Sequence, residues 1–209
     1  MTMHDSGTGV LEKAPETART LSVCVFCGAR PGVSAQAVED ARRVGALLAE
    51  SGHRLVYGVG GIGLMGALAR AAEDGGAEIV GVIPQFLYER ERPNNPPAQT
   101  LIITDDLFER KREMIARADA FLALPGGFGT LDEITEVIAA AHLGVHDKPL
   151  IILDVDGIWG DFLRMVTAIR EHGFAPPRDR PLFHLAGTPE KAMALLAEHT
   201  VVSGGHALG

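Results

Sequence analysis

The chain has 209 residues, of which 46% are hydrophobic and 5% aromatic, with 25 glycines and a formal net charge of −8. This length supports one domain with a sizeable core, and the composition is typical of a parallel α/β sheet rather than an all-β sandwich. The negative charge argues against a nucleic-acid polymer or an anionic membrane as the partner. The sequence shows neither a signal peptide nor an apolar run of ~20 residues, so we expect a cytoplasmic protein.

The expected elements alternate between strands and helices along the chain. Residues 1–19 predict a flexible N-terminal tail, 20–200 a Rossmann-like nucleotide-binding and catalytic domain, and 201–209 a C-terminal tail. Strands are predicted at 20–26, 54–57, 78–83, 101–104, 120–124 and 149–153, helices at 34–51, 64–73, 105–118, 130–143 and 158–172, and a last strand and helix within 183–197. Ser34 is expected to cap its helix, and the Pro- and Asn-rich stretch 84–99 to be an irregular functional loop or flap. The alternation indicates a single α/β domain with a doubly wound parallel sheet and helices on both faces.

The two cysteines, Cys24 and Cys27, form a C-x-x-C motif within the first predicted strand. Side chains three apart on a strand point to opposite faces, so the two thiols should not meet. A second C-x-x-C that could complete a zinc site is missing from the sequence. We therefore expect both to be buried small hydrophobic residues in a reducing compartment.

Three glycine-rich turns follow predicted strands: Cys27–Arg30, Gly58–Gly66 and Pro125–Thr130. In doubly wound folds, ligands bind beyond the carboxyl ends of the strands, where such turns lie. The second turn contains G-x-G-x-x-G, which on its own suggests an NAD-dependent oxidoreductase. The acid expected at the end of the next strand is absent, because Glu78 opens that strand instead. The chain also lacks the G-K-[ST] of a P-loop kinase.

The third turn, PGGFGT, leads from a buried strand into a helix, so its amides should lie at a helix N-terminus. Gly126, Gly127 and Gly129 allow tight folding around an anion, and the helix end adds partial positive charge. The same segment also fits a plain capping box, in which Thr130 caps the helix and Glu133 reaches back to a backbone amide. Both interpretations stay open from local sequence alone.

Several charged or polar residues have more than one explanation. The run at 109–112 is either a solvated helix face or a source of an arginine that orients a phosphate or sugar. His142 and His146 have helical i, i+4 spacing, but they lack the glutamate of H-E-x-x-H, so we expect no metal site. Asp154 and Asp156 follow a strand, where they either reach the crevice or form an Asx turn.

Taken together, these motifs resemble the LONELY GUY (LOG) family of cytokinin-activating phosphoribohydrolases. PGGFGTLDE is similar to the family signature PGGxGTxxE, and ERKREM to its second motif, an R-K followed three residues later by Met. VYGVGGIGLMG, VIPQFL and HLGVHDKPL followed by LDVDGIW also resemble LOG segments, in LOG order. The resemblance spans about 21–174. Members are often labelled lysine decarboxylases, but the sequence has no dedicated lysine context for pyridoxal phosphate.

The resemblance implies a nucleoside 5′-monophosphate substrate, typically an N6-substituted adenosine monophosphate, cleaved to free base and ribose 5-phosphate without a cofactor or metal. It implies Arg110 and Glu133 as the catalytic pair, with Glu133 acting on water and on the oxocarbenium-like sugar. It also implies a homodimer. The implied substrate-binding residues are Gly60, Gly61, Gly63, Glu91, Lys111, Met114, Gly126, Gly127, Phe128, Gly129, Thr130 and Asp132.

The chain departs from the family pattern near the expected base and phosphate pockets. Leu107-Phe108 replaces a Met-His pair, Ala29 replaces a serine after Cys-Gly, and Ala139 replaces a threonine of plant members. These changes put the preferred base in question but not the cleavage chemistry. The alternative function is a non-catalytic carrier of a nucleotide or a molybdopterin-type cofactor on the same fold, which would need the glycine turns but not the Arg110–Glu133 pair.

Overall fold

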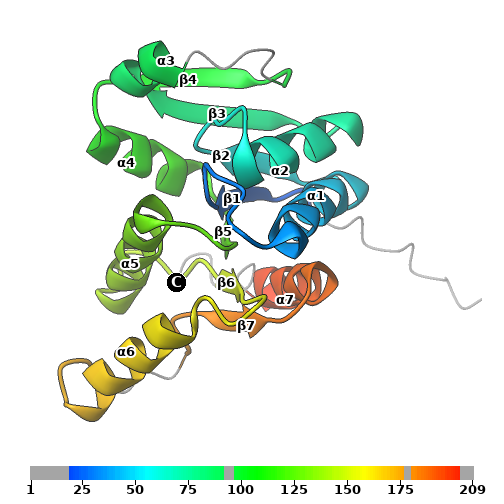
Figure 1. Ribbon diagram of the computed structural model, residues 1–209. Helices are drawn as coiled ribbons and strands as arrows, with labels where there is room; N and C mark the ends of the chain where they lie inside the picture. Colours follow the sequence, from blue (N-terminus) through cyan, green and yellow to red (C-terminus); the bar gives the residue numbers. More distant parts are fainter. Residues whose placement is uncertain (1–18, 92–96, 177–179, 203–209) are drawn as a thin grey trace, which may run out of the picture.

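The computed structural model describes residues 19–91, 97–176 and 180–202. Within these residues, seven strands form one sheet in the order β4-β3-β2-β1-β5-β6-β7, and neighbouring strands pair in parallel (Figure 1). The strands are β1 (Ser22–Phe26), β2 (Arg54–Tyr57), β3 (Ile79–Pro84), β4 (Thr100–Thr104), β5 (Ala120–Ala123), β6 (Leu150–Leu153) and β7 (His184–Ala186). The helices are α1 (Ala35–Glu50), α2 (Gly63–Asp74), α3 (Gln85–Glu91), α4 (Leu107–Arg117), α5 (Phe128–His142), α6 (Gly160–Glu171) and α7 (Pro189–Val202).

Helices cover both faces of the sheet, which confirms the predicted doubly wound α/β fold. The helices α1, α2 and α7 lie on one face, and α4, α5 and α6 on the other (Figure 1). Strands β1, β3, β5 and β6 are nearly continuous apolar runs because both of their faces are buried, whereas the edge strands β4 and β7 are partly exposed. Neither predicted tail is tested, since residues 1–18 and 203–209 lie outside the described residues.

Alternate side chains of strand β1 pack into two separate hydrophobic cores, one on each face of the sheet. Val23 and Val25 pack with α1, α2 and α7, and so does Cys27 just beyond the strand, whereas Cys24 and Phe26 pack on the α4–α5 side. The two thiols are free and buried on opposite faces, as their spacing predicts. Burial raises the pKa of both thiols above the ordinary value, so both remain protonated.

The strand order reverses between β1 and β5, and this topological switch point positions the candidate site. From β1 the chain winds outward through β2, β3 and β4, and then crosses back to place β5 on the other side of β1. Loops that leave the carboxyl ends of two such neighbouring strands diverge and open a crevice. The Cys27–Arg30 and Pro125–Thr130 turns both begin there, with Gly58–Gly63 following the adjacent strand β2.

Two local predictions were wrong, and the structure decides against one of the two interpretations left open for the third turn. The stretch after β3 begins with helix α3 rather than an irregular loop, although 92–96 lie outside the described residues. Ser34 occupies the N-cap position of α1, but its hydroxyl donates to Asp156 instead of capping the helix. The capping box at Thr130 does not form, because Gly127 is the N-cap of α5 and Leu131 N–H already bonds to Gly127 O at 3.0 Å. Thr130 therefore lies inside the first turn.

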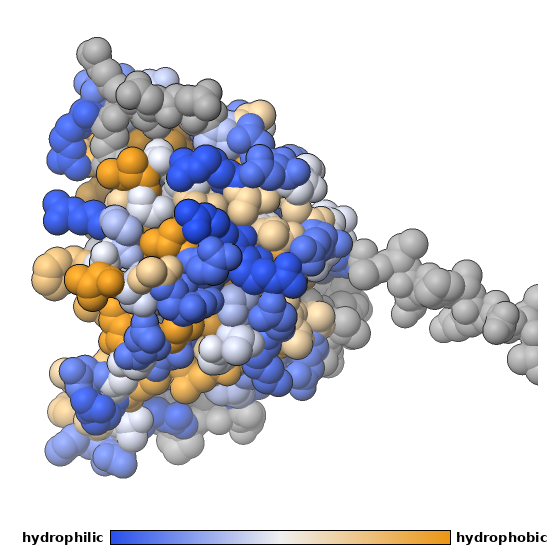
Figure 2. Space-filling model, turned by 45° about the vertical axis from the view of Figure 1, so that its right-hand side comes forward, coloured by the Kyte–Doolittle hydropathy of each residue, from blue (hydrophilic) through white to orange (hydrophobic). Residues whose placement is uncertain are grey.

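The surface is uneven in polarity. Hydrophobic residues gather on the left of the space-filling view, whereas its right-hand side is mainly hydrophilic (Figure 2). None of the helices in the described part of the chain combines the length and hydropathy that crossing a bilayer requires.

Candidate active site at the switch point

A cavity of about 750 Å³ opens at the switch point, within the size range of small-molecule sites. Residues from every turn at the carboxyl ends of β1, β2 and β5 line it, together with parts of α3, α4, α5 and the loop after β6. The lining includes Cys27–Ser34, Ala37, Gly58, Val59, Leu64, Met65, Leu87, Arg90, Arg110, Pro125–Gly127, Gly129, Thr130, Glu133, Val155, Asp156 and Ile158.

Backbone hydrogen bonds hold the glycine turns against one another. Gly28 N–H donates to Pro125 O at 3.0 Å, which ties the β1 turn to the β5 turn. Gly28 O in turn accepts from the N–H groups of Leu64 and Met65, at 3.1 and 3.3 Å, in the first turn of α2. One residue therefore links three turns, and the floor of the pocket is fixed by main-chain bonds rather than by side-chain choice.

The turn after β2 is backbone-constrained. Gly63 has φ +65°, and a Cβ there would lie 2.5 Å from the backbone of Ala29, so this position requires glycine. Val59 also has a positive φ, 57°, which is rare for a β-branched residue and costs on the order of 1–3 kcal/mol. Strain of this kind persists where the surrounding structure over-determines it. Val59 and its neighbour Gly58 both line the pocket.

The turn after β5 presents its glycines to the cavity. A Cβ on Gly127 or Gly129 would meet no atom within 4 Å, so the main chain at both positions is open to a ligand. Gly126 differs, because a Cβ there would overlap the Thr130 side chain, which folds back over the turn. The first amides of α5 therefore border an accessible space at a helix N-terminus, where an anion is favoured.

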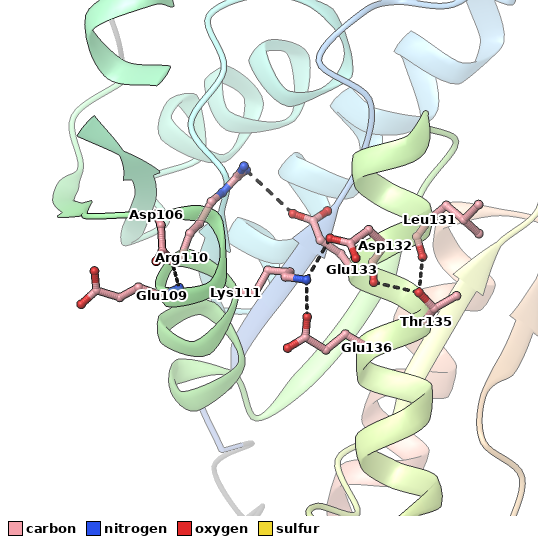
Figure 3. A network of polar contacts seen from close by, with 9 residues as sticks. All are labelled: Asp106, Glu109, Arg110, Lys111, Leu131, Asp132, Glu133, Thr135 and Glu136. Atoms are coloured by element: carbon pink, nitrogen blue, oxygen red, sulfur yellow. Dashed lines mark hydrogen bonds and ion pairs between the residues drawn. The ribbon is translucent and has the colours of Figure 1, made fainter. Parts of the chain in front are cut away.

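Arg110 of α4 and Glu133 of α5 form a buried, oppositely charged pair on the pocket wall (Figure 3). The two residues are only 9% and 7% exposed, and Arg110 Nη2 lies 3.8 Å from Glu133 Oε1. Arg110 Nη2 also donates to Gly58 O at 3.1 Å, and a Cβ on Gly58 would overlap the guanidinium. Arg110 Nε is itself buried, and within the described residues it has no hydrogen-bond partner.

The environment of Glu133 shifts its acidity towards neutrality. Burial raises its pKa from 4.5 to about 7, and the nearby Arg110 guanidinium only partly opposes this. At a pH near 7 the carboxyl group is therefore close to half ionised. A carboxylate of this kind can take up or release a proton at neutral pH, as general acid–base catalysis requires.

Lys111, next to Arg110, binds the other two acids of α5 (Figure 3). Its Nζ lies 2.9 Å from Asp132 Oδ2 and 2.5 Å from Glu136 Oε2. Burial lowers the pKa of Lys111, but the hydrogen bonds to Glu136 and Asp132 outweigh it, so the pKa is raised and the ammonium stays charged. Lys111 thus neutralises two carboxylates that would otherwise repel a negative charge on Glu133.

The structure brings together about half of the residues that the sequence suggested. Arg110, Glu133 and the third turn's Gly126, Gly127, Gly129 and Thr130 line one cavity. The remaining suggested residues that are described, Gly60, Gly61, Gly63, Lys111, Met114, Phe128 and Asp132, are not among the lining. Met114 lies in the core at 1% exposure, while Phe128 is 93% exposed. The side chain of Glu91 lies outside the described residues.

Sequence reasoning missed two walls of the pocket. Arg30 ends the first of the three glycine-rich turns but was not selected as a site residue, and the rest of the β1–α1 connection was passed over, although both follow the strand at the switch point. Leu87 and Arg90 come from α3, in the segment expected to be irregular. Asp156 lines the pocket, which is one of the two roles considered for this pair. Asp154 accepts a hydrogen bond from Trp159 N–H, five residues further on, whereas an Asx turn would bond the backbone two residues on.

The fold and the site define a doubly wound α/β protein with a small-molecule pocket at its switch point and a buried acid–arginine pair in the pocket wall. A family model described as "Possible lysine decarboxylase" matches residues 65–196. The chain is 41% identical over 177 residues to the cytokinin riboside 5′-monophosphate phosphoribohydrolase LOG of Oryza sativa subsp. japonica, covering 85% of this chain and 73% of that protein. It is 40% identical over 177 residues to LOG3 of Arabidopsis thaliana, covering 85% and 82%. The chain therefore belongs to the LOG family, as its motifs suggested.

Solved structures with the same fold include proteins of another function. The molybdenum cofactor carrier protein of Chlamydomonas reinhardtii superposes with a TM-score of 0.66 at 19% identity, covering 88% of this chain and 99% of that one. A molybdenum cofactor binding protein of Rippkaea orientalis gives 0.61 at 19% identity, covering 87% and 98%. At this identity the likeness establishes the fold alone.

Proposed function

We propose that this protein hydrolyses the N-glycosidic bond of cytokinin riboside 5′-monophosphates, which are N6-substituted adenosine monophosphates, to the free base and ribose 5-phosphate. The observation that carries the proposal is the buried Arg110–Glu133 pair, placed beside an accessible helix N-terminus in one pocket. Family membership and the names of relatives at about 40% identity support the same reaction.

The reaction divides between two parts of the pocket. The open main chain around Gly127 and Gly129 holds the 5′-phosphate, because the first amides of a helix have no partner within the helix and lie at its positive end. This anchoring leaves the ribose near Glu133, less than two turns along the same helix. Arg110, which lines the same cavity, orients the substrate through its guanidinium group.

Glu133 carries the chemical step. As the bond from C1′ to the base nitrogen breaks, its electron pair leaves with the base and positive charge grows on the sugar, where the carboxylate stabilises it. Water adds to C1′, and Glu133 takes one of its protons. The base takes up one proton from solvent and Glu133 returns its proton to solvent, so atoms and charge balance and the carboxylate is regenerated. Hydrolysis transfers no electrons to an acceptor and needs no redox cofactor.

The test is a base-release assay by chromatography on the purified protein, with AMP and isopentenyl-adenosine monophosphate as substrates. We expect release by the wild type and loss of about 10³-fold in Glu133→Gln, since a general base contributes 10²–10⁴-fold. Glu136→Gln is the matched control, as it makes the same change on the same helix at a half-exposed acid. Stoichiometric nucleotide binding without release by the wild type would instead support the carrier function.

We further propose that the protein is a homodimer that uses the α4–α5–α6 face. Helix α6 is amphipathic, but none of its residues is buried, and Met165 is 62% exposed. Phe108 of α4, Leu143 at the end of α5 and Phe174 just beyond α6 are also strongly exposed, which is unusual for a monomer. Sedimentation should give a dimer for the wild type and a monomer for Met165→Asp with Leu143→Asp; a wild-type monomer would contradict the proposal.

A cytoplasmic location completes the proposal. Two free, buried thiols suit a reducing compartment, where disulfides do not accumulate.

A further inference from the structure

The arginines of the pocket differ in how far their charge is already engaged. Arg110 faces Glu133 and Gly58 O, and Arg90 also interacts with another group. Arg30 is exposed, and within the described residues its side chain makes no hydrogen bond or ion pair. The pocket's other carboxylate, Asp156, is engaged with Ser34 Oγ at 2.6 Å. In the part of the chain that the structure describes, Arg30 is therefore a pocket cation without a protein counter-charge.

The main chain of Arg30 is held beside the turn after β5. Gly28, two residues earlier, donates to Pro125 O at 3.0 Å, and a Cβ on Gly28 would lie 3.4 Å from Gly126 Cα. On its other side, a Cβ on Gly63 would lie 2.6 Å from Arg30 N, so the start of α2 packs directly against this residue. These contacts fix the base of a long cationic side chain at the edge of the space that Gly127 and Gly129 leave open.

We propose that Arg30 binds the 5′-phosphate of the substrate and makes the pocket selective for nucleoside monophosphates over nucleosides. The proposal rests on the proposed function, because it assumes that the phosphate lies at the Pro125–Thr130 turn. Backbone amides supply only partial charge to a phosphate dianion, whereas a guanidinium supplies a full charge and a planar pair of donors. In a chain of net charge −8, such a local cation also offsets the repulsion that an incoming anion meets.

The experiment compares wild type, Arg30→Ala and Arg30→Lys by calorimetric titration with AMP and with adenosine, and by base-release kinetics where turnover occurs. We expect Arg30→Ala to weaken AMP binding and raise its KM about tenfold, the usual effect of losing one charge-assisted hydrogen bond in a partly solvated site. Binding of adenosine should not change, and kcat should stay near the wild-type value. Arg30→Lys should restore part of the loss, and salt should reduce the difference.

Arg42→Ala is the matched control, since Arg42 is an exposed arginine on α1 that pairs with Glu39 outside the pocket lining. Equal losses for AMP and adenosine, or no loss of AMP binding, would overturn the role of Arg30. Absence of base release from the wild type would overturn the proposed function alone. In that case the AMP and adenosine titrations still decide whether Arg30 recognises the phosphate.

Discussion

Replacing Glu133 by Gln should change the pH dependence of stability as well as activity. Burial raises the pKa of this carboxyl group from 4.5 to about 7 in the folded protein, against the opposing effect of Arg110. The folded state therefore binds a proton more tightly than the unfolded state does. The contribution to stability is fully present below pH 4.5 and is lost as the pH rises through about 7.

The size of the effect follows from the two pKa values. The difference between 4.5 and about 7 is 2.5 pKa units, and each unit corresponds to about 1.4 kcal/mol, so ionising Glu133 costs about 3 kcal/mol. The residue is only 7% exposed, so solvent screens little of this cost. Glutamine at this position has a similar shape but no charge to desolvate, and should lack the cost at every pH.

Urea unfolding of both proteins, followed by circular dichroism from pH ~4.5 to ~8.5, measures the effect. Other titrating groups cancel in the difference between the variant and the wild type. That difference should move in favour of Glu133→Gln by about 3 kcal/mol across the window and level off above pH ~7. Glu136→Gln should show no comparable trend. A difference that stays constant with pH would refute the raised pKa and, with it, the argument for Glu133 as a base at neutral pH.

Three further expectations concern the same pocket. The base-release rate should rise with pH up to about 7 as the buried carboxyl group ionises, which a pH–rate profile would show, and a flat profile would contradict. Gly58→Ala should displace Arg110 and reduce kcat by about 100-fold while thermal unfolding barely changes, since misplacing a catalytic group carries that cost. Gly126→Ala should destabilise the protein by about 1–3 kcal/mol, because the new methyl group overlaps Thr130, whereas Gly127→Ala should not. Thermal unfolding measures both variants, and equal melting temperatures for the two would contradict this prediction.

Sequence patterns predicted the layers of the fold well because they follow from strong local signals. Short apolar runs such as 120–124 have the length and composition of buried strands. Gly52, which was predicted to end the first helix, has φ +67°, a backbone conformation that favours glycine. Helix α3 was missed because Pro84 and the following Pro-rich residues suggested a loop, although Pro84 ends β3 without preventing a helix after it.

Site residues were harder to predict, because the pocket depends on topology rather than on motif spacing. Arg110 and Glu133 could be selected because both belong to recognised motifs. Met114 belongs to the same motif as Arg110, yet four residues along α4 it points into the core. Arg30 ends a predicted glycine-rich turn, but its place in the same pocket as the Pro125–Thr130 turn depends on β1 and β5 being neighbours in the sheet. Selecting Arg30 as a site residue therefore requires knowledge of the strand order.

The pairing of β1 with β5 also has a consequence for how the protein is made. Ser22 and Asp119, which bond at the start of these two strands, are 97 residues apart in the chain. On a ribosome, the first four strands emerge well before β5 can add to the open side of β1. Until β5 is made, the edge of β1 stays unpaired, which favours aggregation, and the later pairing of two strands so far apart in the chain is slow. The pocket is lined by turns that follow both β1 and β5, so a bound ligand should stabilise the contact between the parts of the chain made early and late.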